Sequence, residues 1–198
     1  MTIVIGVTGG IASGKTTAAR MMQREGVVLF DADACVHLLM RDHPECIAAI
    51  AAQFSEALKE GAIARHVLAD AIAADENKLH VLEGIIHPYV REEEINAIMA
   101  AREMGEKAIV LDIPLLFESG ADQLCHIVVA VDVSPQTQRE RAFARVGMSE
   151  EKLARLLSRQ MVPHVRSSKA DIVISSEMGL EQMREAIDQL MEGILSHA

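Results

Sequence analysis

The segment Gly9-Gly10-Ile11-Ala12-Ser13-Gly14-Lys15-Thr16 constrains this chain more than any other feature. It fits the pattern G-x-x-x-x-G-K-[ST], follows an apolar run directly and precedes a helical pattern. Glycines in such a turn let successive backbone N–H groups point at phosphate oxygens, and the following helix adds the positive end of its dipole. The segment therefore predicts a phosphate-binding loop. A mere tight connection accounts less well for a match at all eight positions.

The motif also assigns individual contacts to a bound nucleotide. Lys15 reaches the β- and γ-phosphates, the Thr16 hydroxyl is placed to ligate Mg²⁺, and Thr17 contacts a further phosphate. The backbone cradle consists of Gly10, Ile11, Ala12, Ser13 and Gly14. ATP and Mg²⁺ are therefore the predicted cofactors.

The rest of the chain alternates between strand and helix patterns. Short, almost continuously apolar runs predict strands buried on both faces at Thr2–Thr8, Val27–Phe30, Ala108–Ile113, Ile127–Val133 and Asp171–Ser175. Helical patterns occupy Lys15–Arg24, Glu76–Glu103, Pro135–Arg145, Glu150–Gln160 and Leu180–Leu195. This alternation predicts an α/β fold with a parallel sheet and right-handed crossovers.

One connection, over about residues 34–105, is long and almost wholly helical in pattern. Turn signals stand at His43-Pro44, Gly61 and His87-Pro88. The chain has no repeat, linker or low-complexity tract to mark a second independent domain. We therefore expect a single domain, residues 1–198, that carries this connection as an inserted helical lobe.

Composition narrows the class of protein. Of the 198 residues 50% are apolar, which excludes a disordered chain, and no apolar run reaches the roughly 18 residues of a membrane span. The N-terminus lacks the basic start of a signal peptide, and the three cysteines form no C-x-x-C pair. A net charge of −10 disfavours general nucleic-acid binding. We expect a cytoplasmic protein with small-molecule partners, no nucleic acid and no membrane.

Basic residues concentrate over about residues 136–170. Eight Lys or Arg stand there against three acidic residues, so this segment carries +5 and the remainder −15. Arg141 and Arg145 lie four apart and would share a helix face. For any single arginine the alternative is a solvated face that pairs with neighbouring glutamates. The concentration favours a lid over about residues 136–169 that closes on ATP and excludes water.

Two apolar runs end in a carboxylate. This pattern is typical of a strand that presents an Mg²⁺ ligand at its carboxyl end. Ala108–Asp112 predicts such a strand, in which Asp112 holds Mg²⁺ through water. The run before Asp132 has the same form, and an ordinary strand-end carboxylate is the alternative. The chain lacks the Asn-Lys-x-Asp motif that reads guanine, because Asn77-Lys78 is followed by Leu79-His80. A small-molecule kinase remains.

Such a kinase needs a group that orients or deprotonates the acceptor hydroxyl. Asp31-Ala32-Asp33 follows the second apolar run, at the carboxyl end of a strand, where open α/β sheets bind ligands. Either carboxylate could be the base, and either could instead cap the helix that runs through His37. One could cap while the other faces the substrate.

Further elements stand in order along almost the whole chain: Ile5 to Thr16, Asp31-Ala32-Asp33 with His37, Gly61 to Leu68, His87-Pro88, Asp112 to Glu118, Val131-Asp132-Val133, Gln138, Arg141, Arg145, Gln160 and Ala170 to Ile174. Together they resemble the dephospho-coenzyme A kinases. The Asp-Ala-Asp and Pro-Leu-Leu-Phe-Glu elements are more particular than the phosphate loop, which many kinases share. The resemblance implies ATP-dependent phosphorylation of the ribose 3′-hydroxyl of dephospho-CoA, the last step of CoA biosynthesis.

The resemblance also implies roles for residues of the acceptor side. Asp33 would orient or deprotonate the hydroxyl, with Asp31 beside it. The inserted lobe would contribute Arg65 and His87, although His87 before a proline could instead belong to a helix-entry turn. The segment Pro114–Glu118 would line the floor of the cleft, and its acceptor contacts would be Leu115 and Phe117.

On the ATP side, the resemblance implies a lid that contains Arg141, which acts with Lys15 on the transferred phosphoryl group, and Arg145. The loop near Ser175-Ser176 would lie close to the adenine. The chain departs from the family pattern at four places: Ala12, Ala64, Val146 and the pair Ser175-Ser176. Ala12 stands where the family usually has glycine, which a negative φ would tolerate.

The implied architecture is the three-layer fold of P-loop nucleoside-triphosphate hydrolases, a five-stranded parallel sheet flanked by helices. Its core would span about residues 1–33, 106–135 and 170–198, its acceptor lobe 34–105 and its lid 136–169. We expect a monomer or weak homo-oligomer. Two alternatives remain: a small kinase acting on a nucleoside monophosphate, a sugar acid or shikimate, and a nucleotide-binding regulator that transfers nothing.

Overall fold

The computed structural model describes residues 1–73, 75–177 and 179–196. The chain divides into two compact units, Met1–Phe30 with Ala97–Ala198, and Asp31–Asn96. The second unit comprises most of the predicted inserted lobe, whereas the predicted lid belongs to the first unit. That the chain acts as a single domain stays a prediction.

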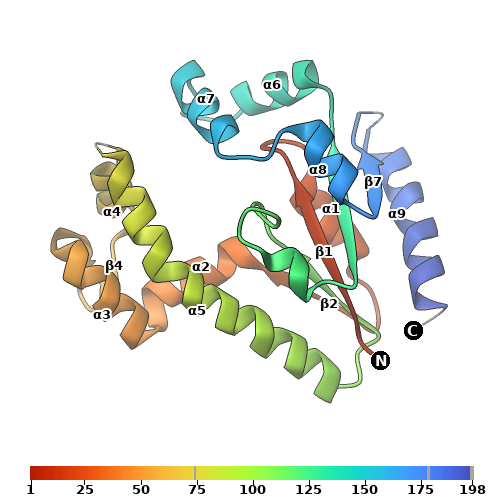
Figure 1. Cartoon of the computed structure of the whole chain (residues 1–198), viewed down its shortest axis with the longest axis horizontal. Coiled ribbons are helices and arrows are strands. Elements are labelled where there is room, and N and C mark those ends of the chain that lie inside the picture. The colour runs from red at the N-terminus through yellow and green to blue at the C-terminus, as the bar shows by residue number, and fades with distance from the viewer. Residues whose placement is uncertain (74, 178, 197–198) are drawn as a thin grey trace. The chain divides into compact units, whose positions relative to one another are not determined.

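The predicted five-stranded parallel sheet is confirmed, and its order is β2-β5-β1-β6-β7 (Figure 1). Its strands are β1 (Ile3–Gly9), β2 (Val27–Asp31), β5 (Ala108–Asp112), β6 (Ile127–Asp132) and β7 (Ile172–Ser175). The helices of the first unit are α1 (Lys15–Met22), η2 (Ala121–Leu124), α6 (Pro135–Phe143), α7 (Glu150–Ser158), α8 (Pro163–Lys169), α9 (Leu180–Leu195) and the last part of α5 (Glu76–Glu103). Because β1 is central, its carboxyl end opens in the middle of the sheet edge.

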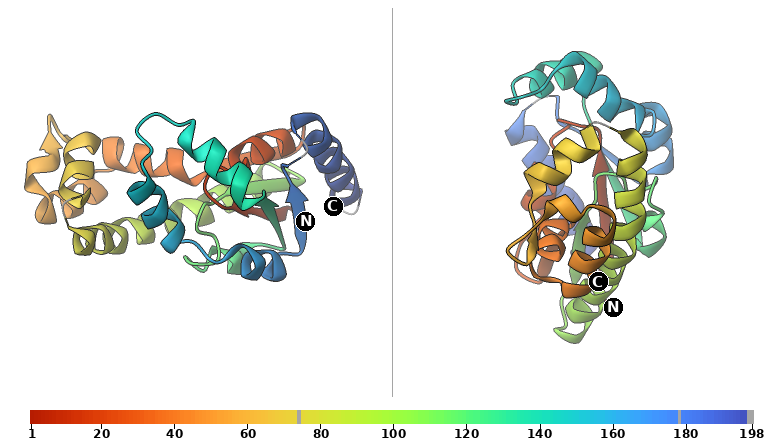
Figure 2. Two further views of the ribbon diagram at one scale, coloured as in Figure 1. Left: turned by 90° about the horizontal axis from the view of Figure 1, so that it is seen from above. Right: turned by 90° about the vertical axis from the view of Figure 1, so that its left-hand side faces the viewer.

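Helices α1 and α9 lie side by side on one face of the sheet (Figure 2). Ile5, Val7 and Val110 of the strands pack there against Met22 of α1 and Ile187 of α9, all buried. The other face is closely covered, because a Cβ on Gly6 would lie 2.5 Å from Cys125 Sγ. Burial on both faces explains the nearly continuous apolar runs.

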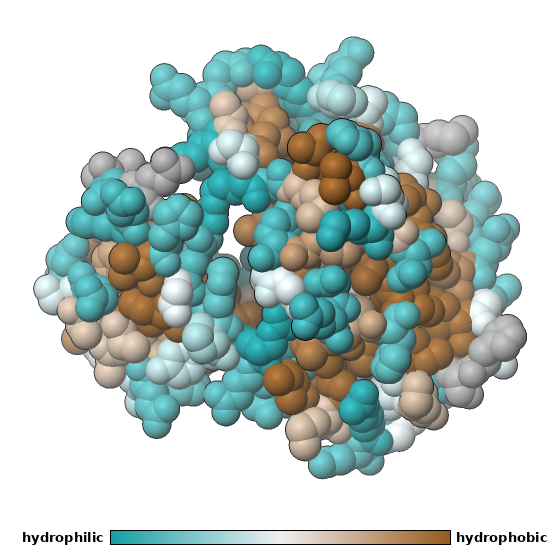
Figure 3. Space-filling model, viewed as in Figure 1, coloured by the Kyte–Doolittle hydropathy of each residue, from teal (hydrophilic) through white to brown (hydrophobic). Residues whose placement is uncertain are grey.

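The surface over β7 and α9 is hydrophobic in part (Figure 3). Val173 and Leu180 are 47% and 65% exposed. In the parts of the chain that the structure describes, no helix combines the length and apolarity needed to cross a membrane.

The second unit contains α2 (Ala32–Asp42), α3 (Pro44–Gln53), η1 (Ser55–Ala57), α4 (Arg65–Ala73) and the first part of α5. The sequence predicts an almost wholly helical lobe with a turn at Gly61, and the structure adds two short strands there: β3 (Leu58–Lys59) and β4 (Ala62–Ile63) form an antiparallel hairpin. Glu60 and Gly61 make the turn with φ values of 50° and 84°. Two-residue strands are too short to show an alternating pattern.

Of the other two turn signals in this unit, one is confirmed and one is wrong. His43 separates α2 from α3, and its Nδ1 accepts from Cys46 N–H at 3.2 Å as a helix cap. Pro88 lies inside α5, so His87-Pro88 is not a helix-entry turn. Proline leaves the carbonyl four residues earlier, that of Gly84, without its helical donor. Gly84 is exposed, so this carbonyl is open to hydration and the helix continues.

Candidate active site

The phosphate-binding loop connects β1 to α1, as predicted. Gly14 precedes α1 with a φ of 91°, a left-handed value that favours glycine. The Ser13 N–H donates to Gly10 O at 3.0 Å, which closes a tight turn. Among the described residues the buried Ser13 hydroxyl finds no partner, and the first N–H groups of a helix have none within it. The loop therefore holds donors for an anionic ligand.

Two carboxylates end the strands that flank β1 on either side, and their partners distinguish them. Asp112, at the end of β5, accepts from Lys15 Nζ, and the two side chains are 2% and 11% exposed. Asp132, at the end of β6, accepts instead from Arg166 Nη2 at 2.6 Å and from the Ser167 hydroxyl. Only Asp112 therefore faces the lysine of the phosphate-binding loop, which supports it over Asp132 as the predicted Mg²⁺ ligand.

Alanine at position 12 was expected to be tolerated through a negative φ, and the structure does not show one. Its φ is 58°, in the left-handed region, where an L side chain is strained. Its methyl group is buried against Ala142 of α6 and Leu153 of α7. The contact with these two helices offsets part of the strain.

We expect Ala12→Gly to change the free energy of unfolding by less than about 1 kcal/mol, because relief of strain is offset by lost burial and greater unfolded-state entropy. Ala12→Val should lose about 2 kcal/mol, since a β-branched residue fits neither the left-handed backbone nor the packed space. Denaturant unfolding measures both variants. Equal stability of the two would show that the left-handed conformation is not kept in solution.

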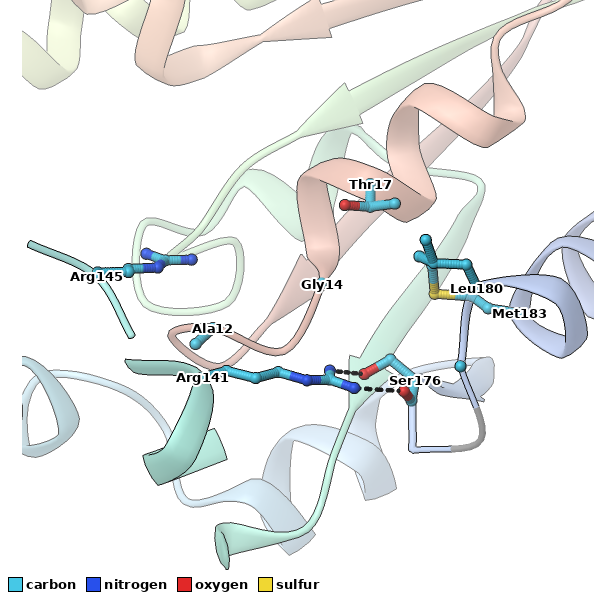
Figure 4. Close-up of a pocket in the computed structure, with 9 residues that line it drawn as sticks. Ala12, Gly14, Thr17, Arg141, Arg145, Ser176, Leu180 and Met183 are labelled. Carbon is cyan, nitrogen blue, oxygen red and sulfur yellow. Dashed lines mark hydrogen bonds between the residues drawn. The ribbon is translucent and has the colours of Figure 1, made fainter. Parts of the chain in front are cut away.

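A pocket of about 350 Å³ opens beside the loop in the first unit (Figure 4). Its lining residues come from the phosphate-binding loop, from α1, from the α6 region and from the β7–α9 region: Ala12, Gly14, Thr17, Arg141, Arg145, Ser176, Gly179, Leu180 and Met183. The volume falls in the range of small-ligand sites. A nucleotide whose phosphates lie on the loop would place its base and sugar here.

Arg141 belongs to the wall of this pocket (Figure 4). Its Nη1 and Nη2 donate to Ser176 Oγ and to Ser176 O, each at 2.8 Å. The Ser176 hydroxyl in turn donates to Ser13 O at 2.6 Å. Ser176 therefore links α6 to the loop in the wall of this pocket, and its nearness to a bound adenine stays a prediction.

The other arginines of the predicted lid differ from one another. Arg139 forms an ion pair with Glu150, and its Cζ lies 5.0 Å from the Phe143 ring centre. For Arg139 the alternative prediction, a solvent-exposed arginine that pairs with a neighbouring glutamate, is therefore confirmed. Helix α6 ends at Phe143, earlier than predicted, and Arg145 lies beyond it. Arg145 is exposed and still lines the pocket.

Glu177 joins the start of α6 to the segment after β7. Its carboxylate accepts from Thr137 Oγ1 at 2.6 Å and from Ser134 N–H at 2.8 Å. These hydrogen bonds, that from Thr137 first, lower the pKa of Glu177. These hydrogen bonds therefore favour the charged form of Glu177, which ties the start of α6 to the segment after β7.

Two glutamines contact the loop in a way that their chemistry did not suggest. Gln138 donates to Ile11 O, and Gln160 accepts from Ile11 N–H, both at 2.9 Å. Neutral amides carry no charge or nucleophile that would mark them in a sequence, and only the resemblance to a known family had included them.

The segment after β5 forms a turn-rich loop in the first unit. Leu115 and Phe117 are half-buried, and Lys169 Nζ lies 5.7 Å from the Phe117 ring centre. Glu118 Oε1 accepts from Met161 N–H at 2.6 Å. The acceptor contacts predicted for Leu115 and Phe117 stay predictions.

In the second unit, Asp31 and Asp33 have different surroundings. Asp31 caps α2, and its Oδ1 accepts from Ala34 N–H at 3.0 Å. Asp33 lies in the first turn of the same helix with an exposed carboxylate. Capping therefore occupies Asp31 and leaves Asp33 available, which favours Asp33 as the candidate base.

Arg65 and His87 are exposed on different helices of the second unit. Arg65 is the first residue of α4, where a cation opposes the positive end of the helix dipole. Helix stability therefore does not explain this arginine. Both residues stay predicted acceptor contacts.

Cys35 and Glu94 are buried side chains of the same unit. Burial, assisted by Glu93 and Glu94, raises the pKa of Cys35 to about 11, and burial also raises the pKa of Glu94. A thiol with so high a pKa is a packing group at neutral pH.

A central parallel strand that enters a helix through this loop defines the class of P-loop nucleotide-binding proteins. Comparison with known proteins narrows that class. The family model described as Dephospho-CoA kinase matches residues 3–182, so the chain belongs to the dephospho-CoA kinase family.

Individual relatives agree with this family. The dephospho-CoA kinase of Agrobacterium fabrum is 39% identical over 193 residues, which cover 97% of this chain and 98% of the relative. That of Rhodopseudomonas palustris is 36% identical over 190 residues, covering 96% and 94%. The solved structure of dephospho-CoA kinase from Campylobacter jejuni, 24% identical, covers 100% of this chain and 99% of its own with a TM-score of 0.75. The last comparison shows a shared fold.

Proposed function

We propose that the chain transfers the γ-phosphoryl group of ATP to the ribose 3′-hydroxyl of dephospho-CoA, giving CoA and ADP. The observation that carries the proposal is a phosphate-binding loop with its lysine in place, in a chain that belongs to the dephospho-CoA kinase family. A bond forms between the 3′-oxygen and Pγ, and the bond between Pγ and the β-phosphate oxygen breaks. The hydroxyl proton passes to a carboxylate.

On the nucleotide side, the backbone of Gly10–Gly14 and the side chains of Lys15 to Thr17 would hold the phosphates. Lys15 pairs with Asp112 in the present structure, and a bound γ-phosphate would offer it a second anion. Arg141 and Arg145 line the adjoining pocket and would hold the base, sugar or phosphates. Preorganised cations of this kind stabilise charge on the transferred group.

On the acceptor side, Asp33 would accept the proton of the 3′-hydroxyl, because it is exposed and does not serve as the cap of α2. Arg65 and His87 would contact the acceptor, and so would Leu115 and Phe117 of the loop after β5. Asp31 would act indirectly, through the cap that sets the direction of α2.

Mg²⁺ fits the donors present. The Thr16 hydroxyl and the buried Asp112 carboxylate supply oxygen ligands, which Mg²⁺ prefers together with substrate phosphates. When bound, the ion would neutralise charge on the β- and γ-phosphates. Thr16 and Asp112 would be its protein ligands.

The direct test incubates the purified chain with ATP, Mg²⁺ and dephospho-CoA and follows the acceptor by mass spectrometry. We expect one added phosphoryl group and one ADP per CoA. If ADP formed without CoA, the nucleotide site would stand and dephospho-CoA would be rejected as the acceptor. Nucleoside monophosphates, sugar acids and shikimate would then be tested in its place. Tight ATP binding without ADP would support a regulator.

Arg141→Ala is expected to raise the KM for ATP about tenfold, because it removes a bidentate contact that shapes the pocket wall. Arg139→Ala is the matched control, since Arg139 lies on the same helix and pairs with Glu150. It should change the KM for ATP less than about twofold, as expected for a surface pair. Equal effects of the two variants would remove Arg141 from the site.

The remaining parts of the proposal concern the setting of the enzyme. Its partners would be ATP and dephospho-CoA, with no nucleic acid or membrane, and it would act in the cytoplasm. A monomer or weak homo-oligomer would suffice, because each proposed contact comes from one chain.

A further inference from the structure

The two backbone polar groups of Ile11, in the phosphate-binding loop, are both held by glutamine side chains. Gln138 of α6 donates from Nε2 to Ile11 O, and Ile11 N–H donates to Oε1 of Gln160, which follows α7. Both distances are 2.9 Å. The glutamines lie 127 and 149 residues away in sequence, so only the fold brings them to the loop.

The loop is shaped to admit one of these amides. A Cβ on Gly10 would lie 2.5 Å from Gln138 Nε2, a distance that a side chain at this position could not keep. Gly10 therefore leaves the space that Gln138 occupies. The half-buried Ile11 side chain packs on the cluster of Ala12, Ala142 and Leu153, so apolar contacts reinforce the same junction.

We propose that Gln138 and Gln160 are positioning residues that hold the phosphate-binding loop in its nucleotide-binding shape and thereby set the affinity for ATP. A loop whose backbone is already held loses less conformational freedom when phosphate binds. Ser176 adds a third hold, through Ser13 O. The choice of ATP as the ligand rests on the proposed function, whereas the contacts of the two glutamines with Ile11 are independent of that function.

The two glutamines use opposite ends of the amide, and this gives a sharp test. Gln138 must supply an N–H, whereas Gln160 must supply an oxygen. Glutamate has only oxygens when ionised, so Gln138→Glu sets a carboxylate against the Ile11 carbonyl, while Gln160→Glu keeps an acceptor for the Ile11 N–H. Both changes add the same charge at the same residue of the loop.

Calorimetric titration with ATP, without acceptor, measures the affinity of each variant. In Gln138→Glu we expect the Kd for ATP to rise at least about tenfold, which corresponds to the loss of one hydrogen bond next to the site. In Gln160→Glu, where the hydrogen bond is kept, we expect the Kd to rise less than about threefold. The charge control is Gln136→Glu, on the exposed side of α6, where Gln136 bonds only Glu140 among the described residues. It should stay within about twofold of the unsubstituted chain.

Neutral variants keep the test open if a carboxylate prevents folding. Gln138→Met and Gln160→Met remove both hydrogen-bonding ends without charge, and each should raise the Kd for ATP about fivefold or more. Steady-state kinetics should show a higher KM for ATP with an unchanged KM for dephospho-CoA. A merely structural role would instead lower the active fraction, and so kcat, and leave both KM values alone.

Equal Kd values for Gln138→Glu and Gln160→Glu, or an unchanged Kd in both methionine variants, would overturn the inference. The proposed function fails differently, since the unsubstituted chain would then form no CoA. ATP affinities that follow the glutamine pattern in a chain that makes no CoA would keep the positioning role and reject only the acceptor.

Discussion

Lys15→Ala is expected to lower kcat about a thousandfold or more, because it removes the cation that faces the transferred phosphoryl group. It should also destabilise the fold, by on the order of 3 kcal/mol, since it leaves the buried Asp112 carboxylate without its partner. Turnover with dephospho-CoA and denaturant unfolding measure the two effects. The sequence alone predicts the first and says nothing of the second.

The double variant Lys15→Ala with Asp112→Asn separates the two effects. Neutralising Asp112 removes the unpaired buried charge, so much of the lost stability should return. Activity should not return, because no cation has been restored and the candidate Mg²⁺ ligand is gone. Near-normal turnover in either variant would reject the assignment of the phosphate-binding loop.

Asp33→Asn is expected to lower kcat about a hundredfold to a thousandfold with little change in the KM for dephospho-CoA. An amide has nearly the shape of a carboxylate but cannot accept the proton in the transition state. Because Asp33 is exposed and does not cap α2, stability should change by less than about 0.5 kcal/mol. Steady-state kinetics at saturating ATP measures the loss.

Asp31→Asn is the matched control for this prediction. Asparagine caps a helix about as well as aspartate, so α2 should keep its start and most of the turnover should remain. Asp31→Ala should lose about 1 kcal/mol of stability through loss of the cap. If Asp31→Asn alone lowered kcat, the two aspartates would exchange roles.

Predictions made from the sequence agree with the structure where the interactions concerned join residues close together in the chain. The phosphate-binding loop and all five strands of the sheet were predictable, because eight consecutive positions define the loop and burial on both faces makes a strand apolar throughout. Two local predictions were wrong, and each has a local cause. Pro88 signals a break yet lies within α5, and the β3–β4 hairpin is too short for any periodicity.

The candidate site was predictable where its residues carry charge. The sequence indicates Lys15, Asp112 and the Asp31-Ala32-Asp33 element, and it offers a helix cap for one of those aspartates, but it does not pair Lys15 with Asp112. Asp112 and Asp132 end runs of the same form, and only the order of strands in the sheet and the packing of α8 give one to Lys15 and the other to Arg166.

The sequence by itself determined which local structures form and which chemistry the chain carries, since apolar periodicity, caps and the glycines of the loop act within a few residues. The tertiary structure decided the pairings: Asp112 with Lys15, Arg141 with Ser176, and Gln138 and Gln160 with Ile11. These contacts join residues 35 to 149 positions apart. A polar side chain has many possible partners at such separations, and only the packed fold selects one.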